Sequence, residues 1–255
     1  MNKLKLALYS DLHLEFLSNK WEPPALDVDV VILAGDIGQH VCGIEWAAAT
    51  FRDKLVIYVV GNHEFYGADI GIISDMRKTA AQFGIHFLEN NVVEIEGVRF
   101  LGTTLWSDFN LYGNRNNGMR AARRYINDYA SIKKNDALLD PKDTMALHYT
   151  AAAWLDDELS KPFDGKTVVV THFAPHRGCI AEEFVGGAMT PYFTADMAPL
   201  MARHKIDLWA FGHTHGNVDF ESEHGCRIVS NQRGYCNEFR EGDNGFRDSL
   251  IIEMP

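Results

Sequence analysis

The chain has 255 residues, of which 46% are hydrophobic and 23% are charged, and this globular composition excludes an intrinsically disordered chain. Its 35 acidic and 24 basic residues give a formal charge of −11, which repels nucleic-acid backbones and disfavours an extended nucleic-acid surface. A chain of this length can bury a core without disulfides, and we expect a single domain over residues 1–255.

Three short apolar segments near the start of the chain predict buried β-strands, over residues 4–9, 28–34 and 55–60. Each segment stops at a polar cluster, and these clusters contain Asp11, Asp36 and Asn62. Apolar spacing predicts helices between the strands, over residues 42–51 and 69–83. This alternation indicates an α/β fold, in which ligands and catalytic groups lie at the C-terminal ends of strands.

The second half of the chain repeats the alternation. Its predicted elements are a hairpin over residues 92–101, a helix over 144–159, a strand over 167–171, a helix over 194–204, a strand over 208–211, and closing strands over 218–220, 227–230 and 250–253. The strands at 167–171 and 208–211 are followed by His172 and by Gly212-His213. Polar side chains therefore follow the strands of both halves.

Residues 105–142 differ from the rest of the chain in charge. They contain seven Lys or Arg and four Asp, which gives a local charge of +3 (7 − 4) in an acidic protein. We expect a cap-like insertion over the sheet edge. Its charge would attract a phosphate-bearing substrate, although a solvated helix face is the commoner reason for such a pattern.

The cysteines and the apolar segments bear on the location of the protein. The four cysteines, Cys42, Cys179, Cys226 and Cys236, lack Cys-x-x-Cys spacing, so we expect reduced thiols and a cytoplasmic protein. Residues 1–10 lack the long apolar segment of an export signal. No window reaches the roughly 18 consecutive apolar residues of a membrane span, so we expect no membrane partner.

The polar clusters at the strand ends share one chemistry, because they offer imidazole, carboxylate and amide donors and no thiolate. Their members are Asp11, His13, Asp36, Asn62, His63, His172, His213 and His215. This donor set suits Mn²⁺, Fe or Zn²⁺ in a catalytic centre rather than a structural zinc site. Each motif alone is common by chance, but the whole set at successive strand ends is not.

The order of these motifs is specific. From the N-terminus, the chain carries Asp11-x-His13, Gly35-Asp36, Gly61-Asn62-His63-Glu64, His172 and Gly212-His213-x-His215. This order resembles the calcineurin-like metallophosphoesterase superfamily, and the resemblance spans residues 11–215. Residues 231–235, Asn-Gln-Arg-Gly-Tyr, are also similar to the Asn-Pro-Arg-Gly-Tyr segment of small bacterial members, with Gln232 in place of proline.

The resemblance implies a four-layer α/β/β/α sandwich of two mixed β-sheets. It also implies two divalent or mixed-valence transition-metal ions (Mn, Fe or Zn). One ion would be held by Asp11, His13 and His215, the other by Asn62, His172 and His213, and both by the carboxylate of Asp36. An anionic bridge would offset the repulsion between two cations about 3.5 to 4 Å apart. A metal-bridging hydroxide would then attack the phosphorus in line with the leaving group.

The same resemblance gives roles in catalysis and substrate binding. His63 lies outside the ligand set, where it would donate a proton to the leaving oxygen or a hydrogen bond to the phosphoryl group. Asn62 would contact the substrate beside its metal ion. Glu64 is a candidate to fix the tautomer of His63. An equally good explanation is that Glu64 is a solvated carboxylate at the start of a loop.

Three further residues are candidates for the mouth of the site. Arg177 and Arg233 would bind phosphate, and His176 would lie beside them. For His176 and Arg177, a position at the exposed surface is a somewhat better explanation than phosphate binding. For Arg233, a structural role and phosphate binding are equally good explanations.

Three functions are compatible with these motifs. The first is hydrolysis of a small or cyclic phosphodiester, because the compact chain with Asn62-His63 is similar to the small bacterial diesterases. The second is a phosphomonoesterase or Ser/Thr protein phosphatase, whose sites tend to carry extra arginines. The third is a noncatalytic protein-binding scaffold, which the complete ligand set disfavours. The expected partner is a small phosphoester, and a homo-oligomer is left open.

Overall fold

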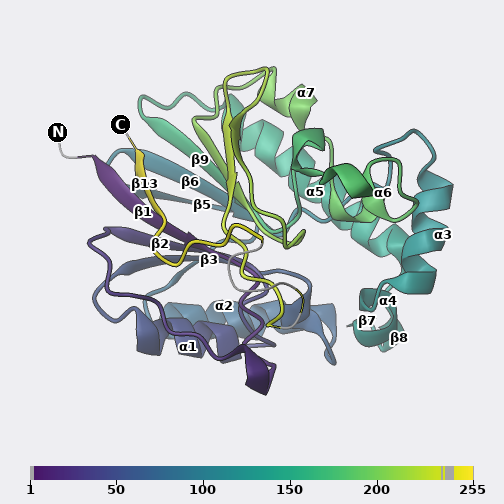
Figure 1. Cartoon of the computed structure of the whole chain (residues 1–255), viewed down its shortest axis with the longest axis horizontal. Helices are drawn as coiled ribbons and strands as arrows, with labels where there is room; N and C mark the ends of the chain where they lie inside the picture. The colour runs from purple at the N-terminus through teal and green to yellow at the C-terminus, as the bar shows by residue number, and fades with distance from the viewer. Residues whose placement is uncertain (1–2, 237, 239–243, 255) are drawn as a thin grey trace.

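The computed structural model describes residues 3–236, 238 and 244–254. Two β-sheets pack face to face, and helices cover their outer faces (Figure 1). This arrangement confirms the expected α/β/β/α sandwich of two mixed sheets. None of the described helices combines the length and the hydrophobicity needed to cross a lipid bilayer.

The first sheet contains the N-terminal strands. Its strand order is β13 (Ile251–Met254), β1 (Leu4–Tyr9), β2 (Val30–Ala34), β3 (Leu55–Val59) and β4 (His86–Phe87). All neighbours are parallel except β13, which pairs antiparallel with β1. Helices α1 (Cys42–Thr50) and α2 (Ile73–Gln82) cover its outer face (Figure 1). The C-terminal ends of β1, β2 and β3 therefore lie at one edge.

The second sheet combines strands of the middle and the end of the chain. Its order is β11 (Asp219–Glu221), β12 (Arg227–Ser230), β10 (Leu208–Phe211), β9 (Lys166–Thr171), β6 (Val98–Thr103) and β5 (Asn91–Ile95). The four central strands are parallel and the two edge strands antiparallel. Helices α5 (Pro141–Ser160), α6 (Thr190–Phe193) and α7 (Ala198–Met201) lie on its outer side (Figure 1).

The apolar strands are buried on both faces. Along β1, Leu6 and Leu8 point into the core between the sheets, and Ala7 and Tyr9 pack toward the outer layer. In the other sheet, Val168 and Val170 of β9 belong to the same inter-sheet core. Burial on both sides explains why the strands are continuous apolar runs rather than alternating patterns.

The predicted helix over residues 194–204 is wrong. The segment that follows α6 leaves the helical conformation and pairs with the loop after β9, where the Ala195 amide donates to the carbonyl of Ala174 and the Met197 amide to that of Pro175. The helix resumes only as the short α7. Competing backbone hydrogen bonds from a distant loop therefore replace the helix that local pattern favoured. The remaining predicted elements differ from the observed ones by a few residues at their ends.

Residues 105–142 form helices α3 (Arg115–Tyr125) and α4 (Asp128–Ser131) and a small hairpin of β7 (Lys133–Lys134) and β8 (Ala137–Leu138). These elements lie to one side of the sandwich, and α3 packs against α5 and α6 (Figure 1). Three of the basic side chains form ion pairs within or next to the insertion, namely Arg115 with Asp108, Arg123 with Asp140 and Lys134 with Asp143.

Candidate active site

The loops that follow five parallel strands meet at one end of the sandwich. They carry Asp11 and His13 after β1, Asp36 after β2, Asn62 and His63 after β3, His172 after β9, and His213 and His215 after β10. Backbone hydrogen bonds link neighbouring loops: the Asp11 amide donates to the Gly35 carbonyl at 3.0 Å, and the Gly212 amide to the His172 carbonyl at 2.9 Å. The two sheets thus bring together side chains that are up to two hundred positions apart.

The backbone is strained at these positions. Five residues have positive φ angles, namely Asp11 (54°), His13 (48°), Asp36 (55°), His213 (77°) and His215 (54°). A side chain in the left-handed region costs free energy, and such residues cluster where the surrounding structure holds them for function. Gly35 precedes Asp36, and Gly212 precedes His213. Glycine at position 212 permits the close approach of neighbouring loops, since a Cβ there would lie 2.7 Å from Oδ2 of Asp11.

One group of donors comprises Asp11, His13 and His215, all buried. The Nε2 atoms of His13 and His215 lie 3.0 Å apart, and Nε2 of His215 lies 3.4 Å from Oδ1 of Asp11. Two imidazole nitrogens that face each other beside a carboxylate offer lone pairs to one cation. This donor set fits a transition-metal ion.

A second buried group comprises Asp36, Asn62, His172 and His213. Nε2 of His172 lies 3.1 Å from Oδ1 of Asn62, 3.2 Å from Nδ1 of His213 and 3.4 Å from Oδ2 of Asp36. Imidazole, carboxylate and amide oxygen converge here without a thiolate. This group also fits an Mn, Fe or Zn ion.

Asp36 lies between the two groups. Its Oδ2 atom is 3.4 Å from Nε2 of His172 and 4.0 Å from Nε2 of His13, while its Oδ1 atom accepts a hydrogen bond from the His63 amide at 2.9 Å. Although burial opposes ionisation, the positive charge of His172 and His63 holds the pKa of Asp36 well below its usual range. The carboxylate is therefore ionised and suited to bridge two cations.

Hydrogen bonds on the far side of the ring fix two of the imidazoles, those of His172 and His215. His172 donates from Nδ1 to the Ala34 carbonyl at 2.9 Å, and Nδ1 of His215 contacts the carboxylate of Glu238. Such contacts leave Nε2 free to face a metal, and outer partners of this kind orient ligands in metal sites. Burial lowers the pKa of His213 well below its usual value, with a further contribution from the charge of His172, so its ring is neutral.

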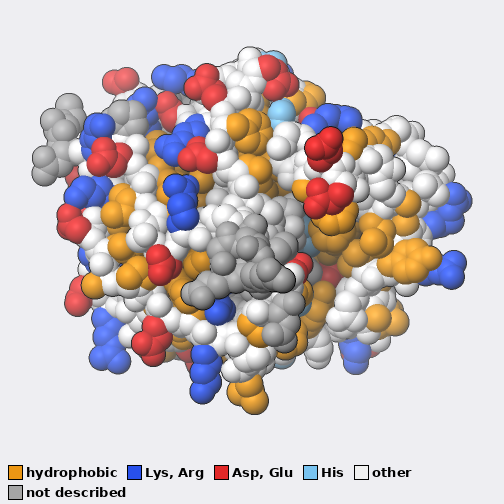
Figure 2. Space-filling view, viewed as in Figure 1, with side chains coloured by type: hydrophobic (Ala, Val, Ile, Leu, Met, Phe, Trp, Pro, Cys, Tyr) orange, Lys and Arg blue, Asp and Glu red, His pale blue; other side chains and the backbone are white. Residues whose placement is uncertain are grey.

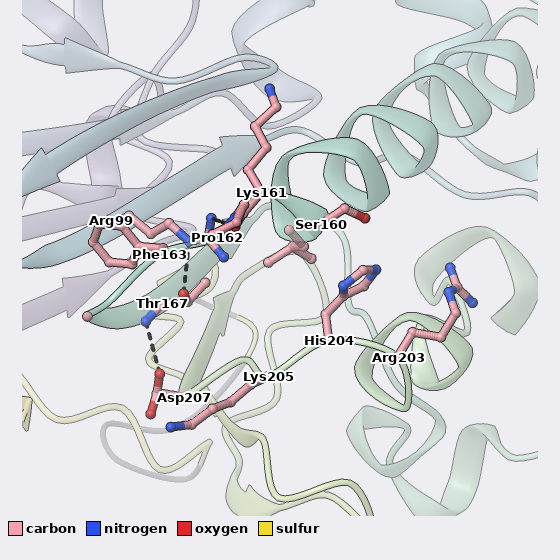
Figure 3. Close-up of a pocket in the computed structure, with 12 residues that line it drawn as sticks. Arg99, Ser160, Lys161, Pro162, Phe163, Thr167, Arg203, His204, Lys205 and Asp207 are labelled. Carbon is pink, nitrogen blue, oxygen red and sulfur yellow. Dashed lines mark hydrogen bonds between the residues drawn. The ribbon is translucent and has the colours of Figure 1, made fainter.

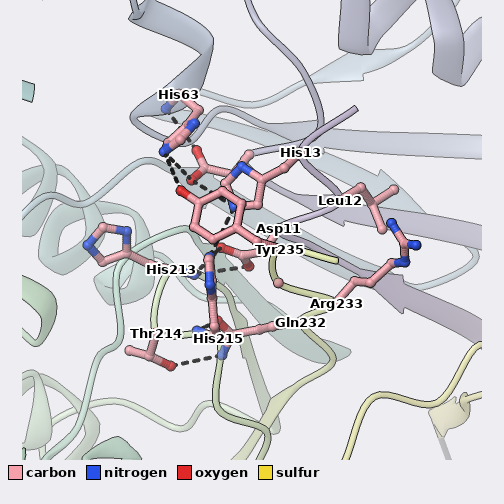
Figure 4. A network of polar contacts seen from close by, with 12 residues as sticks. Asp11, Leu12, His13, His63, His213, Thr214, His215, Gln232, Arg233 and Tyr235 are labelled. Carbon is pink, nitrogen blue, oxygen red and sulfur yellow. Dashed lines mark hydrogen bonds and ion pairs between the residues drawn. The ribbon is translucent and has the colours of Figure 1, made fainter. Parts of the chain in front are cut away.

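His63 lies beside the two donor groups. Nδ1 of His63 is 2.8 Å from Oε1 of Glu15. Its Nε2 is 3.2 Å from the hydroxyl of Tyr235 (Figure 4). Its ring stacks on Tyr66 with centroids 4.1 Å apart. Nε2 also lies 3.9 Å from Oδ2 of Asp36, and His13, Asp36 and His63 are themselves close enough together to hold a cation.

The predicted role of Glu64 as partner of His63 is wrong. Glu64 is fully buried, and its carboxylate accepts hydrogen bonds from the amides of Gly61 at 2.7 Å and of Asp36 and Ile37 at 3.0 Å each. The 3₁₀ turn at His63–Phe65 directs it under the loops instead of toward the imidazole. Glu64 thus ties two ligand-bearing loops together, and Glu15 contacts His63.

Asp128 of the insertion is a site residue that sequence reasoning missed. Its Oδ1 atom accepts hydrogen bonds from Nδ2 of Asn62 and from the hydroxyl of Tyr66, both at 2.9 Å, and its Oδ2 atom accepts from the hydroxyl of Tyr192. Asp128 is completely buried. The motif pattern contained no signal for it, because its partners lie 62 to 66 positions away.

Gln232, which stands where the similar segment has proline, also supports the site. Its Oε1 accepts from the His215 amide at 2.6 Å, and its Nε2 donates to Oγ1 of Thr214 at 2.9 Å and to the Gly216 carbonyl at 2.7 Å (Figure 4). This side chain therefore holds the loop that carries His213 and His215.

The two predicted phosphate-binding arginines contact other parts of the molecule. Arg177 is paired with Asp196 at 2.6 Å and donates to the Leu111 carbonyl. Arg233 donates to the Asn19 carbonyl at 2.8 Å, and Figure 4 shows its guanidinium directed away from the imidazoles. Phosphate binding by either side chain stays a prediction.

His176 and the donor atom of Asn62 are likewise engaged elsewhere. Nε2 of His176 lies 3.1 Å from Glu223, at the protein surface. Nδ2 of Asn62 is bound to Asp128, so its Oδ1 atom is the one that faces the ligand groups. Substrate contact by Asn62 also stays a prediction.

A cavity of about 480 Å³ lies at the opposite end of the second sheet (Figure 3). It is lined by residues next to the starts of β9 and β10, among them Thr167 and Asp207. Its buried Arg99 donates to the carbonyls of Glu158 and Lys161, which belong to the end of α5. This contact caps the helix, so Arg99 has a structural role there.

Comparisons with known proteins agree with this geometry. A family model described as calcineurin-like phosphoesterase matches residues 4–217. A protein of Acanthamoeba polyphaga mimivirus, known as uncharacterized protein L509, is 26% identical over 287 residues, which cover 97% of this chain and 98% of that protein.

Two solved structures are similar in fold. The phosphopantetheinyl hydrolase of Mycobacterium tuberculosis has a TM-score of 0.75 and 18% sequence identity, over 99% of this chain and 96% of that one. A dimetal phosphatase of Danio rerio has a TM-score of 0.51 and 14% identity, over 90% and 87% of the two chains.

Proposed function

Since this chain belongs to the calcineurin-like phosphoesterase family and is a metal-dependent hydrolase acting on phosphoester bonds, we propose that its substrate is a small or cyclic phosphodiester. The observation that carries this proposal is the charge around the donor groups. Glu15, Glu238 and Asp128 each contact a metal-ligand candidate or His63, and each is an additional carboxylate.

The described ion pairs of Glu15 and Glu238 are with histidines, and none is with an arginine. Arg177 and Arg233 make their described contacts with Asp196 and with backbone carbonyls, and no ion pair among the described residues joins an arginine to a ligand candidate. A dianionic monoester would meet more repulsion here than a monoanionic diester. The charge balance therefore favours the diester over a phosphomonoester or a phosphoprotein.

We assign the metal ligands as the donor groups suggest. Asp11, His13 and His215 would hold one ion, Asn62, His172 and His213 the other, and Asp36 both. When bound, two such Mn, Fe or Zn ions supply a water of lowered pKa as nucleophile and positive charge for the phosphoryl oxygens. The buried donors and their outer hydrogen bonds hold this arrangement fixed before substrate binds.

His63 is the proposed proton donor. Its Nε2 atom lies at the edge of the donor groups and faces Oδ2 of Asp36 and the hydroxyl of Tyr235. Asp36 and Glu15 raise the pKa of His63 despite its burial, which favours the protonated ring. A protonated Nε2 can give its proton to the leaving oxygen or hydrogen-bond the phosphoryl group.

Two further assignments belong to this proposal. We propose that residues 105–142 form a cap within one domain, because Asp128 reaches the Asn62 side chain from there. We also propose a cytoplasmic location, which the free state of all four cysteines supports. On the face seen in Figure 2, basic and acidic side chains are interspersed, as suits a small substrate better than a nucleic acid.

Turnover of matched substrates tests the proposed function. Metal-reconstituted protein is assayed with bis(p-nitrophenyl) phosphate and p-nitrophenyl phosphate, and then with a phosphopantetheinyl diester, the group named for the structurally similar mycobacterial hydrolase. We expect kcat/KM for the aryl diester to exceed that for the monoester by at least about tenfold. Preference for the monoester would overturn the diester assignment, and undiminished turnover by chelator-treated protein would overturn the metal-dependent mechanism.

A further inference from the structure

Glu15 is a buried carboxylate with an unusual set of neighbours. Only 8% of its side chain is exposed, and its Oε1 atom lies 2.8 Å from Nδ1 of His63 and 3.2 Å from Nδ1 of His13. Its Oε2 atom is buried and has no hydrogen-bond partner among the described residues. A buried carboxylate needs partners to offset desolvation, and here two imidazoles provide them.

These contacts determine which ring nitrogen faces the centre. Because a carboxylate oxygen only accepts, the contact at 2.8 Å places a proton on Nδ1 of His63. The opposite nitrogen, Nε2, then faces the Tyr235 hydroxyl at 3.2 Å and Oδ2 of Asp36 at 3.9 Å. Stacking on Tyr66 limits tilting of the ring but does not choose between its nitrogens.

We propose that Glu15 is a positioning residue that fixes the tautomer and orientation of His63, so that Nε2 presents its proton to the leaving oxygen of the substrate. This inference rests on the proposed function of His63. Glu15 is thus the carboxylate partner of His63, a role for which the sequence had suggested Glu64. The partner instead comes from the loop after β1, 48 positions away.

In the proposed reaction, Glu15 holds His63 in place while the phosphoester bond breaks. The oxygen of a water molecule forms the new bond to phosphorus, and the bond to the leaving oxygen breaks with its electron pair. The leaving oxygen takes the proton from Nε2 of His63, while Nδ1 keeps its hydrogen bond to Glu15. A proton lost by the attacking water returns His63 to its starting state through solvent.

Glu15 also contacts His13, so the test must separate an effect on His63 from an effect on a metal ligand. The main variant is Glu15→Leu, which removes the acceptor at similar side-chain size. Glu15→Gln is the conservative variant, because its amide oxygen can still accept from Nδ1. Glu22→Gln, an exposed carboxylate on the same β1–β2 connection, is the matched control.

The measurement is kcat for a series of aryl phosphodiesters of increasing leaving-group pKa, together with metal content by elemental analysis. We expect Glu15→Leu to slow the ester with the poorest leaving group about 100-fold, and the 2,4-dinitrophenyl ester less than about threefold. Glu15→Gln should recover part of the loss, and Glu22→Gln should match the wild type. The double variant with His63→Ala should be no slower than His63→Ala alone, and metal content should stay unchanged.

Two results would overturn the inference. One is equal slowing of all esters, and the other is loss of metal from Glu15→Leu, since both indicate action through His13. A failure of the proposed function gives a different pattern, because His63→Ala itself would then show no dependence on the leaving group. If the role of His63 is right and that of Glu15 is wrong, the loss of kcat increases steeply with the leaving-group pKa for His63→Ala. For Glu15→Leu, the loss is then the same for all esters.

Discussion

The side-chain amide of Asn62 donates to Oδ1 of Asp128 at 2.9 Å, and Oδ1 of Asn62 consequently faces Nε2 of His172. A carboxylate from the insertion thus sets the orientation of a proposed metal ligand. The hydroxyls of Tyr66 and Tyr192 hold the same carboxylate. The insertion is thereby joined to the centre through one fully buried residue.

This relationship predicts the effect of Asp128→Asn. The new amide can donate toward Asn62, which removes the preference for the observed orientation of Asn62. We expect affinity for one of the two ions to fall about 10- to 100-fold, measured by calorimetric Mn²⁺ titration of chelator-treated protein. Asp136→Asn, at an exposed position of the same insertion, should leave both affinities unchanged. Unaltered binding in Asp128→Asn would contradict the role of this contact.

Replacement of Asp36 by Ala should reduce metal content and activity together. Its Oδ2 atom lies near His13 of one donor group and His172 of the other, so both sites lose a ligand. We expect fewer than two ions per chain by elemental analysis and a fall in kcat of at least about 1,000-fold. A variant with full activity would show that Asp36 does not bridge.

Replacement of His63 by Ala should slow turnover and leave both ions bound. The ring lies beside the donor groups, and its Nε2 is 3.9 Å from Oδ2 of Asp36. We expect kcat for a diester with a poor leaving group to fall about 100-fold or more, with unchanged metal content. Loss of an ion would instead identify His63 as a ligand.

The two arginines predicted to bind phosphate can be tested by Arg177→Ala and Arg233→Ala. Arg177 is paired with Asp196, and Arg233 is bonded to the loop at Asn19. Because these contacts already use the guanidinium groups, we expect KM for a diester to change less than roughly twofold in each variant. A tenfold rise in KM would support the sequence-based prediction that this residue binds phosphate.

Glu64→Gln should destabilise the fold. The carboxylate accepts from the amides of Gly61, Asp36 and Ile37, and an amide group cannot accept all of these hydrogen bonds. We expect the free energy of unfolding to fall by about 1–3 kcal/mol, measured by urea denaturation of the metal-free protein. Tyr58→Phe, which removes one further hydrogen bond to Glu64, should cost less. Equal stability of Glu64→Gln and the wild type would show that these hydrogen bonds contribute little.

Much of the architecture could be predicted from the sequence. The apolar runs now seen as β1, β2, β3, β9 and β10 are buried on both faces, so hydrophobicity alone located them to within a few residues at their ends. Parallel strands of a sheet end at one edge, and this rule brings together polar residues far apart in the chain. The sequence therefore indicated the donor set and its likeness to metallophosphoesterases. It failed at residues 194–204, where hydrogen bonds to Ala174 and Pro175 interrupt the predicted helix.

The partners of the site residues were decided by the tertiary structure. Glu64 was the partner of His63 that the sequence suggested, but the packing of the β1 loop against the β3 loop brings Glu15 to His63 instead. Asp128 reaches Asn62 because α4 packs beside that loop, which no local pattern encodes. Hydrogen bonds depend on a few tenths of an ångström and on direction, whereas hydrophobic periodicity depends only on which face is buried. The ends of strands can therefore be predicted from the sequence, whereas the side-chain contacts beyond those ends are determined by the tertiary structure.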